Sequence, residues 1–151
     1  MIDGVKVKKL KVIPDERGYV MEMLRTDDEL FRKFGQAYVT TAYPGVVKAW
    51  HSHRVQTDNL VCVSGMVKLA LYDGRKGSAT RGEVNEFFLG DLEPQLVAIP
   101  PGVLHGFKTI SETTAIVINF VTELYNATAP DVQRVEAHSK DIPYDWARKD
   151  R

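Results

Sequence analysis

Alternation of apolar and polar positions with a period of two dominates this chain. In the clearest case, Val67, Leu69 and Leu71 alternate with Lys68 and Ala70. Side chains of a strand point alternately to its two faces, so the pattern predicts half-buried strands. Further apolar runs, rich in valine, isoleucine and aromatic residues, lie at 38–41, 46–50, 60–63, 87–89, 96–99 and 115–121. Proline, glycine, aspartate and serine separate these runs, which is typical of an all-β sandwich or barrel.

One segment near the N-terminus instead predicts a short helix. Thr26 and Glu29 have the spacing of a capping box, in which each side chain bonds a free backbone N–H. Apolar residues at 30, 31 and 34 would form its buried side, and Gly35 would end it.

Length and charge narrow the classes of function. The chain has 151 residues, which suits a single domain over 1–151, and 20 basic residues balance 20 acidic ones. Without a basic excess a nucleic-acid partner is not expected, whereas a small anionic ligand needs only two or three local cations.

We expect no membrane span, because no apolar stretch approaches about 20 residues. The N-terminus lacks a signal-peptide core, which favours a cytoplasmic protein. Cys62, the only cysteine, is flanked by valines and predicts a buried strand thiol.

Two segments carry histidines in informative places. His51 and His53 are two residues apart on a predicted strand, so both project from one face, and Asp58 follows closely. Burying two unpaired imidazoles is costly, which favours a site over histidines bonded at a strand edge, although the second interpretation stays open. His105 follows the rigid turn Pro100-Pro101-Gly102, where it is either a site residue or a capping histidine.

The spacings Gly-x5-His-x-His-x4-Asp-x6-Gly and Pro-x-Gly-x2-His resemble the two motifs of the cupin superfamily. That resemblance implies a double-stranded β-helix, a jelly-roll barrel with a ligand cavity in its mouth. Within the cupins, blocks at 15–22, 45–51, 99–107, 111–113 and 141–146 are similar to the dTDP-4-dehydrorhamnose 3,5-epimerase family. The family acts without a cofactor on a nucleotide sugar, removing a proton from a carbon beside the 4-keto group.

The resemblance also implies roles for individual residues. His51 aligns with the family's base, and Lys48 stands where the family has an arginine that stabilises the enolate or holds diphosphate. Lys48 needs a bulge to share a face with His51. Arg17 and Glu22 match residues that reach the site of a neighbouring subunit, which implies a homodimer with exchanged N-terminal segments. The expected substrate contacts are Arg17, Glu22, Gln36, Lys48, Asn59, His105, Asn119 and Tyr125.

Three positions depart from the family pattern. Ser139 stands where the family orients its base with an aspartate, although Asp141 is two residues away. Asn119 or Ile118 stands at the position of the tyrosine that serves as the acid on the opposite face of the sugar, and Asn59 replaces a lysine. The tyrosines that could replace the missing acid are Tyr38, Tyr43 and Tyr125.

Four functions therefore remain open. The first is an epimerase acting on a dTDP-4-keto-6-deoxyhexose, with His51 as base. The second is a sugar-nucleotide 3,4-ketoisomerase, in which His51 and His53 move protons on one face. The third is a metal cupin, with a divalent transition metal held by His51, His53, Asp58 and His105. The fourth is a sugar-nucleotide binder without catalytic activity.

Overall fold

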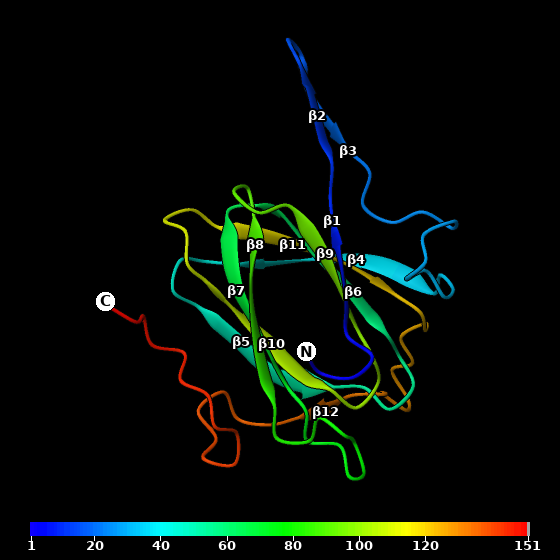
Figure 1. Cartoon of the computed structure of the whole chain (residues 1–151), viewed down its shortest axis with the longest axis vertical. Helices are drawn as coiled ribbons and strands as arrows, with labels where there is room; N and C mark the ends of the chain where they lie inside the picture. Colours follow the sequence, from blue (N-terminus) through cyan, green and yellow to red (C-terminus); the bar gives the residue numbers. More distant parts are fainter. Residues whose placement is uncertain (151) are drawn as a thin grey trace.

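The computed structural model describes residues 1–150 and contains two five-stranded antiparallel sheets and a separate hairpin (Figure 1). The first sheet has the order β1 (Lys6–Lys9), β9 (Gln95–Ile99), β6 (Asp58–Ser64), β11 (Ala115–Val121) and β4 (Gln36–Ala42). The second has the order β12 (Gln133–Arg134), β5 (Val47–Ser52), β10 (Leu104–Thr109), β7 (Met66–Tyr72) and β8 (Val84–Gly90). Strands β2 (Val12–Asp15) and β3 (Gly18–Met21) form the hairpin. The all-β prediction is confirmed.

The main core lies between the two sheets. Leu69 and Leu71 of β7 meet Val97 and Ile99 of β9, and all four side chains are fully buried. These residues have the period-two spacing of the sequence pattern, so each strand turns its apolar face to the other sheet. Burying apolar area in this way stabilises the fold by about 25 cal/mol per Å².

The outer faces of both sheets are also covered, which explains the apolar runs that do not alternate. Leu96 and Ala98 of β9 point away from the main core and pack with Leu10 and Leu30. On the other sheet, the tail after β12 packs Ile142 and Trp146 against Trp50 and Ala70. The tail is further tied down by hydrogen bonds that Lys108 Nζ and Lys68 Nζ donate to the carbonyls of Trp146 and Ala147.

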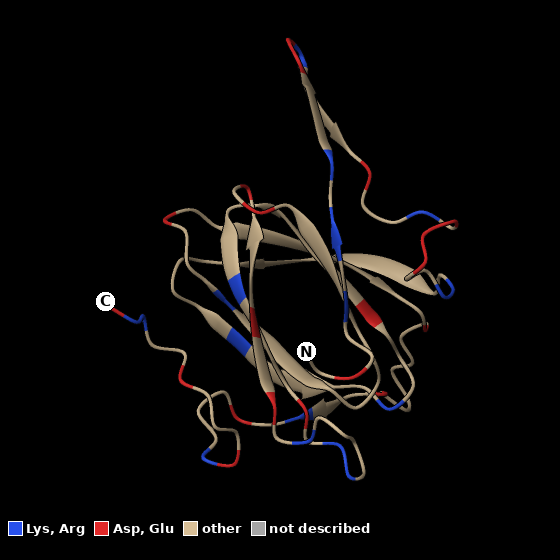
Figure 2. Cartoon of the chain, in the orientation of Figure 1, with Lys and Arg blue, Asp and Glu red and all other residues tan. Residues whose placement is uncertain are grey.

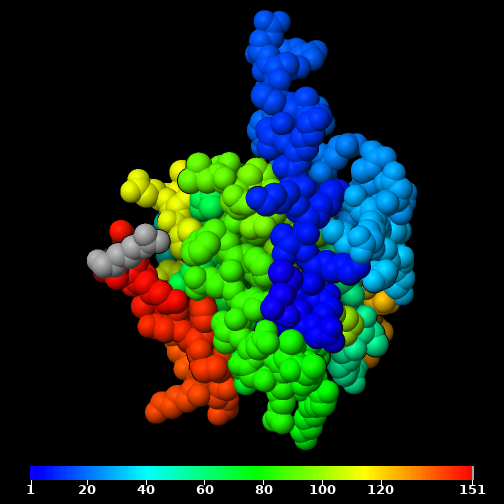
Figure 3. Space-filling model, in the orientation of Figure 1, coloured from blue at the N-terminus to red at the C-terminus, as the bar shows by residue number. Residues whose placement is uncertain are grey.

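The β2–β3 hairpin projects away from the two sheets (Figures 1 and 3). Four of its apolar side chains are exposed by 38–63%, those of Val12, Ile13, Tyr19 and Val20. Charges of both signs are interspersed over the loops, the hairpin tip and the tail (Figure 2).

The predicted helix near the N-terminus is wrong. Residues 26–30 form turns and bends, and 31–35 have no regular structure. Asp28 explains the difference, because its carboxylate accepts hydrogen bonds from the backbone N–H of Arg25 and from Lys8 Nζ. Such side-chain bonds compete with the helical ladder in a segment too short to nucleate on its own. The described residues contain no helix that could cross a membrane.

Candidate active site

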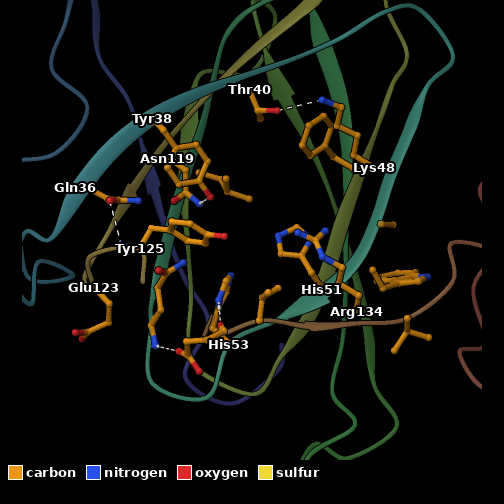
Figure 4. Close-up of a pocket in the computed structure, with 18 of the residues that line it drawn as sticks. Gln36, Tyr38, Thr40, Lys48, His51, His53, Asn119, Glu123, Tyr125 and Arg134 are labelled. Carbon is orange, nitrogen blue, oxygen red and sulfur yellow. Dashed lines mark hydrogen bonds between the residues drawn. The ribbon is translucent and has the colours of Figure 1, made fainter. Parts of the chain in front are cut away.

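A cavity of about 1070 Å³ opens between β4, β5 and β11 and the segment 123–137. The cavity lies at one end of the space between the sheets, so that its opposite walls come from different sheets (Figure 4). Its volume is at the upper end of the range of about 300–1,000 Å³ typical of small-molecule sites.

Three histidines gather at one wall of this cavity. His51 lies on β5, His53 just beyond the end of that strand, and His105 directly opposite His51 on β10. The ring centroids of His51 and His105 are 4.1 Å apart, and those of His51 and His53 are 5.8 Å apart. The cluster unites the two histidine-bearing segments of the sequence.

A bulge in β5 brings Lys48 to the same cavity. His105 pairs with His51 but Phe107 pairs with Lys48, so β5 has one extra residue at this point. Gly106 permits the bulge, because a Cβ there would overlap Ala49. The Lys48 ammonium donates hydrogen bonds to Thr40 Oγ1 at 3.2 Å and to the Thr41 carbonyl at 2.6 Å.

Hydrogen bonds fix which ring nitrogens carry hydrogen. His105 Nδ1 lies 3.0 Å from the Val103 carbonyl, and His53 Nδ1 bonds the Asp131 carbonyl. A carbonyl only accepts, so each Nδ1 donates, and a ring bonded in this way has its lone pair at Nε2 when it is neutral. These two Nε2 atoms lie 3.6 Å (His53) and 3.5 Å (His105) from Asp58 Oδ2.

The Nε2 atoms of His53 and His105 converge on Asp58 Oδ2, and a proton or a metal ion could bind among these three atoms. His105 Nε2 is buried and has no hydrogen-bond partner among residues 1–150. Ring nitrogens of the three histidines lie within 4.8 Å of one another, so they could share a proton or ligate a divalent metal ion. The residues that would hold such an ion are His51, His53 and His105, with Asp58 beside them.

The wall keeps His51 in its neutral form. Burial, together with the nearby charges of His105, His53 and Arg134, lowers the pKa of His51 to about 2. Burial also lowers the pKa of His105, although the Asp58 carboxylate opposes this shift. A neutral imidazole has a free lone pair and can accept a proton at neutral pH.

A chain of polar groups connects the histidines to the opposite wall. Asp58 Oδ1 accepts hydrogen bonds from Gln56 Nε2 at 3.0 Å and from Asn119 Nδ2 at 2.6 Å. Asn119 Nδ2 also donates to the Tyr38 hydroxyl at 2.9 Å. Sequence reasoning did not find this chain, because it depends on the pairing of Asn119 with Tyr38 across β11 and β4.

Some of the predicted substrate contacts lie at the cavity and others do not. Gln36 and Tyr125 line it, and Gln36 Oε1 accepts the backbone N–H of Tyr125 at 3.2 Å. Asn59 lies outside the lining, buried and bonded to the Phe120 carbonyl at 2.7 Å. His105 lies directly behind His51, with 1% of its surface exposed.

Arg17 and Glu22 lie away from the cavity of their own chain. Arg17 is at the hairpin turn, bonded to Asp15, with 84% of its side chain exposed. Glu22 follows the hairpin and pairs with Arg25 at 3.0 Å. A substrate contact by either residue therefore requires a second subunit.

The remaining candidates from the sequence lie elsewhere. Ser139 and Asp141 are outside the lining and bond each other, the Asp141 N–H donating to Ser139 Oγ at 3.2 Å. Tyr43 is 73% exposed and also outside the lining. Sequence reasoning missed Arg134, which β12 places beside His51; only the two-residue pairing of β12 with β5 brings it there.

The two antiparallel sheets, with a histidine cluster and a ligand cavity between them at one end, place the protein in the class of cupin-type barrels. The sequence model of dTDP-4-dehydrorhamnose 3,5-epimerase matches residues 1–151. The chain belongs to this family of sugar-nucleotide epimerases, which confirms the resemblance seen in the sequence and the cupin fold it implied.

Individual relatives agree with this assignment. The chain is 42% identical over 146 residues to the spore coat polysaccharide biosynthesis protein SpsL of Bacillus subtilis (strain 168), covering 97% of each chain. It is 40% identical to the probable low-salt glycan biosynthesis epimerase Agl13 of Haloferax volcanii, covering 96% of this chain and 94% of that protein. The crystal structure of a dTDP sugar isomerase from Desulfovibrio desulfuricans G20 superposes with a TM-score of 0.92 at 33% identity, covering 99% and 94% of the two chains.

Proposed function

We propose that this protein is an epimerase of a dTDP-4-keto-6-deoxyhexose, with His51 as the base. The observation that carries the proposal is the position of the His51 imidazole in the lining of a sugar-sized cavity, in a member of the epimerase family. The ketone acidifies the neighbouring C–H bond, and His51 takes that proton. The electron pair moves into the carbon–carbon bond, and the negative charge goes to the former carbonyl oxygen.

Lys48 provides the positive charge that this intermediate needs. Lys48 lines the same cavity as His51 because of the β5 bulge. A fixed cation stabilises the developing oxyanion or holds the diphosphate, and it acts as a point charge because an ammonium lacks the fork of arginine.

The reaction proposed here needs no cofactor, because the substrate ketone itself stabilises the carbanion. The test is turnover after dialysis against a chelator, with metal analysis of the same sample. Full activity with less than about 0.1 metal equivalent per chain supports a metal-free enzyme. Loss of activity that Mn²⁺, Fe²⁺, Ni²⁺ or Zn²⁺ restores would instead support the metal cupin, for which the unpartnered His105 Nε2 is the favouring observation.

The active form that we propose is a homodimer with exchanged N-terminal hairpins. Its support is the projecting hairpin (Figure 1) with four exposed apolar side chains, and the position of Arg17 outside the lining of its own cavity. The test mixes an Arg17→Ala chain with a His51→Asn chain, each inactive by itself. Recovery of activity in the mixture shows that Arg17 works in its partner's site, whereas a sedimentation mass of one chain would remove Arg17 and Glu22 from the site.

The decisive experiment for the activity is incubation with dTDP-4-keto-6-deoxyglucose in D₂O, followed by NMR. Deuterium at carbon 5 or carbon 3 with inverted configuration supports the epimerase. A His51→Asn variant is expected to lose about 10³-fold in rate or more, since general-base catalysis contributes about 10²–10⁴. Absence of exchange in the wild type rules the proposal out.

The same spectra test the second candidate, a 3,4-ketoisomerase. The observation that favours it is His53, which lines the cavity on the same wall as His51. It predicts a 3-keto product, and a His53→Asn variant with unchanged turnover would count heavily against it.

A further inference from the structure

Inversion at a carbon requires a second proton carrier, and this inference therefore rests on the proposed epimerase. A base that removes a proton from the substrate and returns it to the same face of the resulting enolate regenerates the substrate. The donor must lie across the cavity from His51, on a wall formed by the other sheet.

Tyr38 occupies that opposite wall. It lies on β4 of the first sheet, whereas His51 lies on β5 of the second, and both line the cavity. Figure 4 shows Tyr38 and Asn119 on one side of the open space and His51 on the other. Tyr38 is 40% exposed and lines the cavity, so a ligand can reach it.

The amide of Asn119 sets the direction of the Tyr38 hydroxyl. Asn119 Oδ1 accepts the backbone N–H of Asn59 at 2.9 Å, which places the amide nitrogen toward Asp58 and Tyr38. The phenol oxygen is therefore an acceptor in this bond, and its own hydrogen remains available for another acceptor. Asp58 Oδ1 anchors the same amide from the other side, at 2.6 Å.

We propose that Tyr38 is the general acid that protonates the enolate on the face opposite His51, and that Asn119 is its positioning residue. The phenol O–H bond breaks as the new C–H bond forms, and the enolate electrons restore the ketone. The step leaves a phenolate on Tyr38 and an imidazolium on His51. Water returns a proton to the phenolate and removes one from the imidazolium after the product leaves, so the enzyme is restored without any net change in protons.

The surroundings of Tyr38 suit this role. Burial raises the pKa of Tyr38, and the negative charge of Asp58 raises it further, whereas the Asn119 bond lowers it. The hydroxyl therefore keeps its proton at neutral pH, and the Asn119 N–H is ready to stabilise the phenolate at the moment of transfer.

The other two tyrosines fit less well. Tyr125 lines the cavity but is 68% exposed, and the bond that ties it to Gln36 involves only its backbone N–H. Tyr43 is outside the lining. Tyr43 is therefore the control, because it is 73% exposed and lies outside the cavity lining.

The test compares Tyr38→Phe with Tyr43→Phe in D₂O, with dTDP-4-keto-6-deoxyglucose as the probe. Tyr38→Phe is expected to form inverted product at least about 10²-fold more slowly than wild type. It should still exchange the substrate C–H for deuterium without inversion, within about threefold of the wild-type exchange rate, because His51 is intact. Tyr43→Phe should invert within about threefold of wild type, because its side chain does not line the cavity.

The remaining outcomes separate this proposal from the proposed function. If Tyr38→Phe inverts at the wild-type rate, the role of Tyr38 is overturned while the epimerase stands. The same holds if this variant loses both exchange and inversion although dTDP still raises its melting temperature as much as that of wild type. No exchange in the wild type overturns the epimerase itself. As the second variant, Asn119→Leu keeps both the phenol and the base. The Asn119→Leu variant should invert more slowly than wild type, and the alkaline limb of the pH profile of its inversion rate should shift. An unchanged pH profile contradicts the positioning role of Asn119.

Discussion

Two fully buried carboxylates, Asp58 and Asp73, show how differently this barrel treats the same chemical group. Asp73 is surrounded by donors: it forms an ion pair with Arg75 at 2.8 Å and accepts the hydroxyls of Ser78 at 2.6 Å and Thr80 at 2.7 Å. Asp58 has amide donors on Oδ1 only, and its Oδ2 faces His53 and His105 at 3.5–3.6 Å, beyond ordinary hydrogen-bond length.

The difference separates a structural role from a functional one. A buried charge whose lone pairs are all matched holds a loop in one conformation, as Asp73 does for residues 75–80. A buried charge that lacks some of its hydrogen-bond partners lowers the stability of the fold, and such charges are common at binding and catalytic sites. The predictions below run from the largest expected effect to the smallest.

Replacing Asp73 with asparagine should lower the free energy of unfolding by about 2–4 kcal/mol, because the Arg75 guanidinium loses its charged partner in a half-buried place. Urea titration followed by fluorescence measures this change. Turnover per folded molecule should stay at the wild-type value, since the loop lies outside the cavity. Loss of activity with unchanged stability would reverse the assignment of the two carboxylates.

Replacing Asp58 with asparagine should give the opposite pattern. The side-chain oxygen can still accept from Gln56 and Asn119, and the new amide can donate to the free Nε2 of His105, so stability should change by less than about 1 kcal/mol. The negative charge beside the histidines is lost, and kcat should fall about 10- to 100-fold. Steady-state kinetics and a urea titration on one preparation decide between this result and a purely structural Asp58.

Acid should erase the contribution of Asp73. Hydrogen bonds from Arg75, Ser78 and Thr80 hold the pKa of Asp73 below its ordinary value, despite the opposing effect of burial. The unfolded chain then binds the proton first, so this stability is present above about pH 4 and is lost as pH falls further. The gap in unfolding free energy between wild type and Asp73→Asn should therefore shrink between pH 5 and pH 2. A constant gap would contradict the ion pair.

The smallest effect is expected at Cys62, a third buried titratable group. Burial raises the pKa of its thiol to about 11, and Sγ lies 3.2 Å from the Ser64 carbonyl. Little thiolate exists at pH 8, so a thiol reagent should label the native protein only as fast as it opens, and the activity should not change in the meantime. Rapid labelling in the absence of denaturant would show that the inner face of β6 is open to solvent.

Much of this fold was readable from the sequence because its strands follow local rules. The alternation at 67–71 depends only on which face of β7 meets the core, and the turn residues mark the strand ends. The helix expected from Thr26 failed because Lys8, distant in sequence, supplies a partner for Asp28. Local signals give no information on such a partner.

The sequence by itself determined that His51 and His53 share a face and that His105 follows a rigid turn, because strand geometry and proline restrict the backbone locally. Only the tertiary structure decided which groups they meet. The pairing of β11 with β4 joins Asn119 to Tyr38, the bulge opposite Gly106 turns Lys48 inward, and β12 brings Arg134 to His51. Each of these contacts joins strands far apart in the chain, and their register is set by packing of the whole barrel.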